Sequence, residues 1–82
     1  MNLFVTIHDR NGAVFEGNAV SLSSYNQKGK FDVLTEHANF ITLIQKEILI
    51  VKPDGSQKNV VVGNGVMRVV GNTVDIYLGV KK

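Results

Sequence analysis

The chain has 82 residues, of which 44% are hydrophobic and 20% are charged, and its formal net charge is only +2. This length and composition are typical of one globular domain, which we expect to span residues 1–82. The lack of cysteine excludes disulfides and thiolate metal sites, and no apolar run approaches the ~18–20 residues that a membrane-spanning helix needs.

The N-terminal half shows the alternating pattern of a β-protein. Leu3, Val5 and Ile7 alternate with other residues, which indicates a strand over residues 3–8 with at least one buried face. The Asn11-Gly12 pair is a strong hairpin signal, because both residue types tolerate positive φ. Further short strands are predicted, in chain order, at residues 13–15, 19–23, 31–34 and 40–44.

The C-terminal half continues the series of short apolar runs separated by turns. Residues 48–51 form a continuous aliphatic run, which is typical of a strand covered on both faces. Pro53-Asp54-Gly55-Ser56 is the clearest turn, since proline pre-sets φ and glycine accepts the left-handed region. We interpret Gly63-Asn64-Gly65 as a connection between two separate strands. The strands predicted in this half cover residues 48–51, 59–62, 66–70 and 73–80.

Regular turn spacing and strand alternation together predict an all-β fold. We expect a small two-sheet β-sandwich or flattened barrel of about eight to ten short strands. The side chains expected between the sheets are Val5, Val20, Phe31, Val33, Ile48, Ile50, Val61, Val69, Val74 and Ile76. The glycines expected at positive φ, or where a side chain would clash, are Gly17, Gly29, Gly55 and Gly65.

Chemical motifs are sparse in this sequence. Glu36 and His37 invite an acid–base or metal interpretation, but neighbours in an extended loop point apart, and two ligands would leave a metal under-coordinated. Gly63-Asn64-Gly65 lacks the Lys-Ser/Thr pair of a phosphate-binding loop. Most of the aromatic residues alternate with polar ones and are better explained as core than as stacking platforms. We therefore predict no catalytic, cofactor-binding or metal-binding residue, and no enzyme.

Gly29-Lys30-Phe31-Asp32-Val33-Leu34 and Glu36-His37-Ala38-Asn39-Phe40-Ile41-Thr42 are two of five stretches that together carry a family resemblance. The other three are Val14–Gly17, Asn64–Val69 and Asn72–Ile76. In their order and spacing, these stretches resemble the N-terminal β-sandwich of the epsilon subunit of F-type ATP synthases. The chain departs from the family pattern at Asp32, Asn39, Lys46-Glu47 and Arg68, where glycine, proline, Pro-Gly and glutamate are usual. The family's C-terminal helical hairpin has no counterpart in these residues.

The resemblance implies a central-stalk (rotor) subunit of a proton- or sodium-translocating F-type ATP synthase. In that family the sandwich binds the gamma subunit and the c-ring, so that rotation of the ring is coupled to ATP synthesis. The resemblance therefore implies a non-catalytic part without a cofactor and without a nucleic-acid partner. It also implies a cytoplasmic location, peripheral on the inner face of the energy-coupling membrane.

By the same resemblance, the loop of residues 35–40 and the nearby turn of residues 26–30 are expected to face the c-ring together, at one end of the sandwich. The residues expected to bind partners are Lys28, Lys30, Glu36, His37, Asn39 and Phe40. Two alternatives stay open: a freestanding β-sandwich adaptor with a different protein partner, and a small basic nucleic-acid-binding barrel. The basic residues are scattered rather than arranged in a stripe, which argues against the second alternative.

Overall fold

The computed structural model describes residues 2–34 and 39–79, and these residues form strands and turns without any helix. The all-β prediction is therefore confirmed. The strands in chain order are β1 (Leu3–Asp9), β2 (Gly12–Ala19), β3 (Ser21–Asn26), β4 (Gly29–Val33), β5 (Phe40–Val51), β6 (Gln57–Val70) and β7 (Thr73–Leu78).

Tight turns join the hairpins, and their side chains explain why the chain reverses there. At the β3–β4 turn the side-chain oxygen of Asn26 accepts the N–H of Lys28 at 2.9 Å. At the β5–β6 turn a carboxylate oxygen of Asp54 accepts the N–H of Ser56 at the same distance. Such side-chain bonds mimic a backbone turn. The glycine of each turn has positive φ, as predicted, whereas the prediction for Gly17 is wrong because this residue is an ordinary strand residue of β2.

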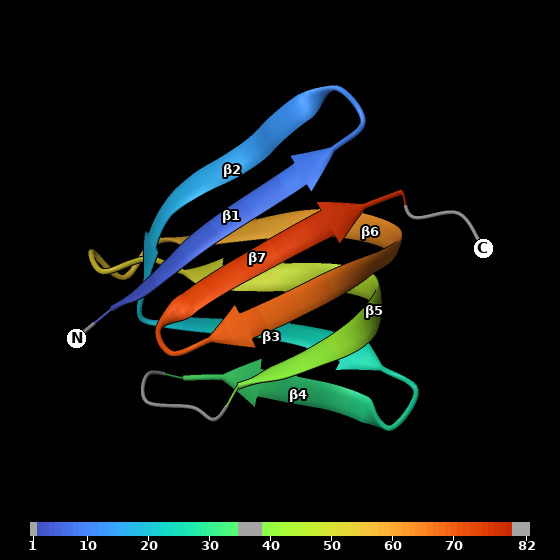
Figure 1. Cartoon of the computed structure of the whole chain (residues 1–82). Helices are drawn as coiled ribbons and strands as arrows, with labels where there is room; N and C mark the ends of the chain where they lie inside the picture. Colours follow the sequence, from blue (N-terminus) through green and yellow to red (C-terminus); the bar gives the residue numbers. More distant parts are fainter. Residues whose placement is uncertain (1, 35–38, 80–82) are drawn as a thin grey trace.

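The strands form one continuous hydrogen-bonded sheet in the order β2-β1-β7-β6-β5-β3-β4. The pairs β1–β2, β6–β7, β5–β6, β3–β5 and β3–β4 are antiparallel, while β1 and β7 run parallel. Figure 1 shows that this sheet does not lie flat but turns over on itself, so that β1 and β7 pass in front of the first part of β6.

A bulge in the two longest strands makes the fold-over possible. Gln45 pairs with Asn64 but the next residue, Lys46, pairs with Val62, so Gly63 is an extra residue in β6. Such bulges bend a strand and increase its twist. The bend divides the sheet into two layers (Figure 1). The first layer holds β2, β1, β7, the second half of β6 and the first half of β5; the second layer holds the remaining halves, β3 and β4.

The two-layer sandwich is confirmed, but several strand boundaries were predicted wrongly. The strand predicted at residues 19–23 is interrupted at Val20, where the chain bends between β2 and β3. Residues 40–44 and 48–51 are parts of the single strand β5, and residues 59–62 and 66–70 are parts of β6. Gly63-Asn64-Gly65 is therefore not a connection between strands but the bend inside one. The last strand ends at Leu78 rather than at residue 80, which lies outside the described residues.

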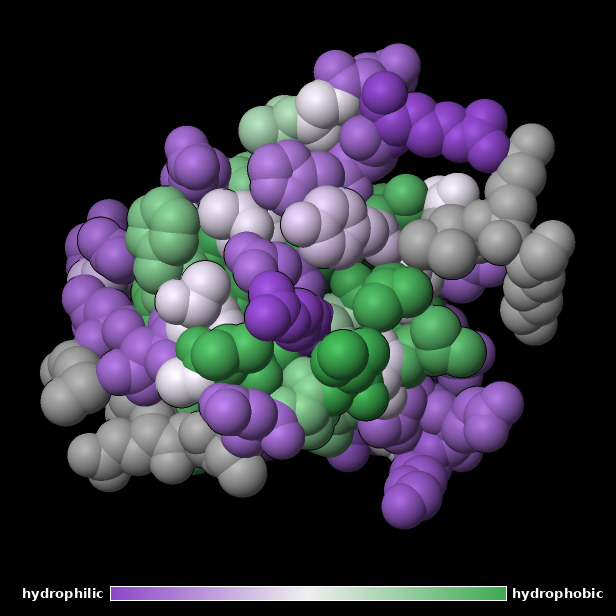
Figure 2. Space-filling view, in the orientation of Figure 1, coloured by the Kyte–Doolittle hydropathy of each residue, from purple (hydrophilic) through white to green (hydrophobic). Residues whose placement is uncertain are grey.

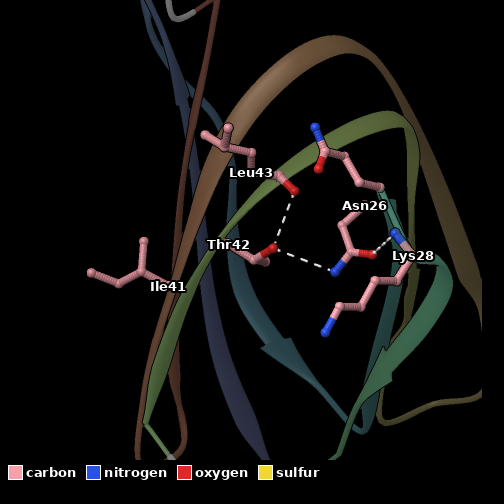
Figure 3. Close-up of a pocket in the computed structure, with 6 residues that line it drawn as sticks. Asn26, Lys28, Ile41, Thr42 and Leu43 are labelled. Carbon is pink, nitrogen blue, oxygen red and sulfur yellow. Dashed lines mark hydrogen bonds between the residues drawn. The ribbon is translucent and has the colours of Figure 1, made fainter.

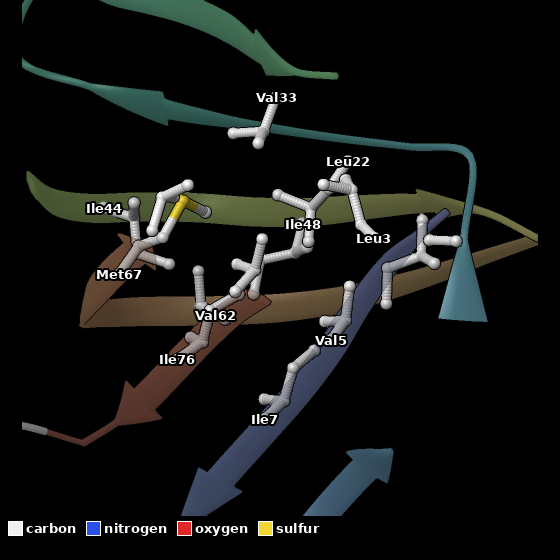
Figure 4. Close-up of a cluster of buried hydrophobic side chains, with 14 residues drawn as sticks. Leu3, Val5, Ile7, Leu22, Val33, Ile44, Ile48, Val62, Met67 and Ile76 are labelled. Atoms are coloured by element: carbon white, nitrogen blue, oxygen red, sulfur yellow. The ribbon is translucent and has the colours of Figure 1, made fainter. Parts of the chain in front are cut away.

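The core fills the space between the layers (Figure 4). Its buried side chains are Leu3, Val5, Ile7, Ala19, Leu22, Val33, Ile44, Ile48, Ile50, Val62, Met67, Val69, Val74 and Ile76. Within residues 2–34 and 39–79, the one buried polar side chain is that of Ser24, whose hydroxyl donates to the carbonyl oxygen of Glu47 at 2.8 Å. Seven of the ten side chains predicted for the core are fully buried, and Phe31 packs against it half-buried.

Two core predictions are wrong for different physical reasons. Val61 is 85% exposed, because Val62 points into the core and neighbouring strand residues point to opposite faces. Val20 is 40% exposed, because it lies in the bend between β2 and β3, where the chain passes from the first layer to the second. The buried residues on either side of that bend are Ala19 and Leu22.

Candidate protein-binding surfaces

The outward side of the first layer carries a set of exposed or half-buried apolar side chains. Strand alternation places them there, because their neighbours in sequence fill the core. Figure 2 views this side and shows hydrophobic residues gathered around a hydrophilic centre. We call this surface the apolar face and define it by Phe4, Ile41, Leu43, Val66, Val70 and Tyr77.

A polar row crosses the middle of the apolar face. Arg68 pairs with Ile41 of β5 on one side and with Asp75 of β7 on the other, and Asp75 pairs with Thr6 of β1. The hydroxyl of Thr6 donates to one carboxylate oxygen of Asp75 at 2.8 Å. Arg68 approaches the other carboxylate oxygen at 4.0 Å, and its side chain is 58% exposed. This loose contact leaves most of the guanidinium donors available to a docking partner.

An aromatic pair extends the apolar face toward its edge. The rings of His8 and Tyr77 stack with centroids 5.5 Å apart and an interplanar angle of 21°. Tyr77 is half exposed, and Phe4 lies on the same outward side. The interpretation of the aromatics as core residues therefore holds for those that pack against the buried cluster (Phe15, Phe31 and Phe40) but not for Phe4 and Tyr77.

This face was missed in the sequence, although a signal for it was present. Leu3-Phe4-Val5 and Val69-Val70 place apolar residues on both sides of a strand, which is typical of strands covered on both faces. In a sandwich of two layers, one of those sides faces outward. Contiguous exposed apolar surface of this kind marks protein-binding sites.

The described partner-binding candidates lie at two places in the fold. Lys28 and Lys30 are exposed at the β3–β4 turn, where β4 begins. Asn39 and Phe40 lie where β5 begins, near the other end of β4 (Figure 1). Lys28 nevertheless lines a hollow together with Ile41, the residue after Phe40. Residues 35–38 of the loop are not described, so the expectation that the turn and the loop face a partner together stays a prediction. Glu36 and His37 fall outside the described residues.

Asn39 and Phe40 have structural partners of their own. The side-chain oxygen of Asn39 accepts the N–H of Gly71 at 2.9 Å, which ties the start of β5 to the β6–β7 turn. Phe40 is half-buried and packs against the core. The exposed lysines at the β3–β4 turn are thus better placed to contact a partner than these two residues.

A polar groove lies beside the β3–β4 turn. Its first part has a volume of about 380 Å³ and is lined by Asn26, Gln27, Lys28, Ile41, Thr42 and Leu43 (Figure 3). A second hollow of about 200 Å³ continues it; both are lined by Asn26, Gln27 and Leu43, and the second is also lined by Ile44, Gln45 and Asn64. These two hollows together are called the β5 groove below.

Neither a metal site nor a membrane-spanning helix is found in the part of the chain that the structure describes. Residues 2–34 and 39–79 contain no group of three or more histidine, aspartate or glutamate side chains that could hold a metal ion. No helix among them is long and apolar enough to cross a membrane.

Comparison with known proteins gives a consistent result. The sequence profile described as "ATP synthase, Delta/Epsilon chain, beta-sandwich domain" matches residues 2–79. The ATP synthase epsilon chain of Sulfurimonas denitrificans is 37% identical over 60 residues, which are 72% of this chain and 46% of that protein. The epsilon chain of Endomicrobium trichonymphae is 37% identical over 78 residues, which are 93% of this chain and 56% of that protein. The chain thus spans about half the length of the curated relatives it matches.

Solved structures show the same fold at low sequence identity. A chain in the mitochondrial ATP synthase of Euglena gracilis, solved with OSCP, F1 and c-ring, matches with a TM-score of 0.87 at 15% identity over 94% of this chain and 50% of that one. A chain in the central stalk and c-ring structure from Tetrahymena thermophila matches with a TM-score of 0.75 at 10% identity, over 95% of this chain and 63% of that one.

Proposed function

Since the chain belongs to the family of ATP synthase delta/epsilon chains, in their β-sandwich domain, we propose that it is a non-catalytic central-stalk (rotor) part of an F-type ATP synthase. In this role it binds the gamma subunit and the c-ring and passes rotation of the ring to the catalytic head. Residues 1–82 act as a single domain, and the location is peripheral, on the cytoplasmic side of the energy-coupling membrane.

The apolar face is the observation that carries this proposal. A rotor part must hold its partner without slipping, which requires a broad, well-packed contact rather than a pocket. The apolar face offers aromatic and aliphatic side chains around Arg68, and interface hot spots are enriched in such aromatic and arginine residues. We assign this face to the gamma subunit.

The c-ring contact is assigned to the β3–β4 turn. Lys28 and Lys30 are exposed there, at the end of β4 away from Asn39 and Phe40. Charged side chains at the rim of a contact set its register and its rate of formation more than its affinity. This assignment keeps the two lysines of the expected site and leaves Asn39 and Phe40 to stabilise the fold.

The test is co-purification of the chain with gamma subunit and c-ring from the same organism. Val70→Asp places a charge on the apolar face and is expected to weaken gamma binding by about tenfold or more. Val61→Asp is the matched control, because Val61 is 85% exposed on the second layer. Equal gamma binding by both variants and the parent would remove the apolar face from the proposal.

The adaptor alternative predicts a different outcome of the same experiment. A freestanding adaptor would fail to bind gamma subunit and c-ring in the parent form, while retaining an intact fold by circular dichroism. Binding of the parent chain to gamma, together with its loss in Val70→Asp, would exclude that alternative.

A further inference from the structure

The first half of β5 has one paired edge and one open edge. Residues 40–45 pair with β6 on one side. On the other side β3 pairs with β5 only from Gln45 onward, because β3 ends at Asn26 and the chain turns into β4. Across residues 2–34 and 39–79, no strand therefore covers the edge at Ile41 and Leu43. An uncovered strand edge is a template on which another chain can add a strand.

The polar groups along this edge are held by long bonds. The hydroxyl of Thr42 donates to the carbonyl oxygen of Leu43 at 3.2 Å, and the side-chain amide of Asn26 donates to that hydroxyl at 3.4 Å (Figure 3). Good bonds are shorter, about 2.7–2.8 Å for O–H···O and about 2.9–3.0 Å for N–H···O. The carbonyl oxygen of Leu43 thus faces the β5 groove and accepts only a weak hydrogen bond from Thr42. A backbone N–H of an added strand would give this carbonyl a stronger hydrogen bond.

The side chains around the edge define what an added strand would carry. Figure 3 shows Ile41 and Leu43 on the side of β5 away from Asn26, so every second residue of an added strand would continue the apolar face. The intervening residues would face the groove, toward which Lys28 extends its side chain. An apolar residue therefore suits one set of alternate positions, and a polar or acidic residue suits the other.

The charge at this end of the molecule favours an acidic strand. Lys30 pairs with Tyr25, the residue before Asn26, and the amino group of Lys46 lies 5.1 Å from the centre of the Tyr25 ring. Lys28 lines the groove itself. The described residues that line the two hollows include no aspartate or glutamate. Lys28 is therefore the one charged residue among the described residues that line the groove, and its charge favours an acidic ligand there.

We propose that the β5 groove binds an extended acidic segment of a partner protein, which adds a strand to the open edge of β5 at Ile41 and Leu43. Acidic side chains of the segment face Lys28, and its apolar side chains continue the apolar face beside Ile41 and Leu43. The proposal shares Lys28 with the assigned c-ring contact, but it goes beyond the rotor role and does not depend on it, because it rests on the edge and the charge of this chain.

The test adds each of three synthetic peptides to the isotope-labelled chain. Nuclear magnetic resonance then monitors the amide groups of the chain. The first peptide alternates glutamate with valine, the second replaces glutamate by lysine, and the third is the acidic peptide with alternate backbone nitrogens methylated. The acidic peptide is expected to shift the backbone amides of Ile41 and Leu43 and the side-chain amide of Asn26. The methylated peptide lacks the donors for strand pairing and is expected to cause no shift.

Two variants of the chain sharpen the test. Lys28→Gln is expected to weaken binding of the acidic peptide by about three- to tenfold, and to weaken it less at high salt. Lys58→Gln removes an exposed charge at the start of β6, distant in the sheet from the groove, and is expected to leave binding unchanged. Failure of the gamma co-purification leaves these peptide results untouched, so the two proposals fail separately.

Three outcomes would overturn the proposal. The first is the absence of amide shifts at Ile41 and Leu43 with the acidic peptide. The second is equal binding of the basic or the methylated peptide, which would mean that neither charge nor strand pairing selects the ligand. The third is binding to vesicles of anionic lipid but not to the acidic peptide, which would assign the lysines to a membrane surface instead.

Discussion

The amino group of Lys46 lies 5.1 Å from the centre of the Tyr25 ring, at the bulge where the two layers join. The same lysine has a backbone φ of 72°, in the left-handed region that non-glycine residues rarely occupy. The cation–π contact is therefore made by a residue, Lys46, whose backbone is strained. Its contribution of about 0.5–1 kcal/mol at an exposed site offsets part of that strain.

Replacement of Lys46 by valine is expected to destabilise the fold by about 1–3 kcal/mol. A β-branched residue at positive φ adds strain, and the contact with Tyr25 is lost as well. Urea denaturation followed by circular dichroism measures the change. Lys58→Val is the control, because Lys58 is an exposed strand residue without positive φ. Equal midpoints for the two variants would contradict the strained bulge.

A second test of the bulge concerns Gly65. A Cβ atom at this position would lie 2.8 Å from the carbonyl oxygen of Tyr77, which is closer than such contacts allow, and 3.1 Å from a methyl carbon of Leu78, which is tight. Gly65→Ala is therefore expected to cost about 1–3 kcal/mol. Gly63→Ala is its neighbour control, because a Cβ there meets nothing within 4 Å. Coinciding thermal melts of the two alanine variants would contradict the close approach of Gly65 to Tyr77.

The turns and the strand periods could be predicted because the signals are local. Pro53-Asp54-Gly55-Ser56 and the alternation of Val74 and Ile76 contain their own information, and the structure agrees with both. The continuity of β6 through Gly63 could not be predicted, because it depends on the pairing of its neighbours with Gln45 and Lys46, which are distant in sequence. The two glycines that resemble a break in fact permit a bulge and a close approach.

The register of β6 and the position of the site residues also depend on partners. Three successive valines follow Asn59, so alternation alone does not decide which of them points inward. The separation of Lys28 from Phe40 follows from the direction of β4, which carries the chain from one end of the second layer toward the other. The apolar face could not be predicted, because the packing of the two layers decides which side of each strand faces outward.

The corrected register gives a prediction for the core. Ile48→Ala is expected to destabilise the fold by about 2–4 kcal/mol, because it removes fully buried methyl groups and leaves a cavity. Val61 is exposed and pairs with Glu47, the residue before Ile48. Val61→Ala is therefore expected to change stability by less than about 0.5 kcal/mol. Equilibrium unfolding in guanidinium measures both. A large loss in Val61→Ala would show that the register is shifted by one residue.

The β5–β6 turn gives a prediction of pH dependence. Hydrogen bonds from the side chain and the backbone of Ser56 lower the pKa of Asp54 from its ordinary value of 3.8. A lowered folded-state pKa means that the stabilisation is present above that ordinary value and is lost as the pH falls through the lower folded-state pKa. Asp54→Ala is therefore expected to be less stable than the parent at neutral pH.

The difference between the parent and Asp54→Ala is expected to shrink as the pH falls below 3.8. Thermal melts at a series of pH values measure it, and Asp32→Ala serves as a second exposed aspartate outside this turn. A difference for Asp54→Ala that stays constant from neutral pH into strong acid would show that the carboxylate charge has no role in the turn.

The last prediction concerns the proposed c-ring contact at the β3–β4 turn. Lys28→Glu with Lys30→Glu reverses both exposed charges there and is expected to weaken binding to the c-ring, with the larger effect at low salt. Binding to the gamma subunit is expected to stay intact, because the apolar face lies on the first layer and β4 belongs to the second. Lys58→Glu with Arg10→Glu applies the same change of charge at exposed positions away from the turn. The measurement is c-ring binding and proton-driven ATP synthesis in the reassembled complex. When the double variant at the turn couples proton flow to synthesis as well as the parent and the control do, the ring contact lies elsewhere on the sandwich.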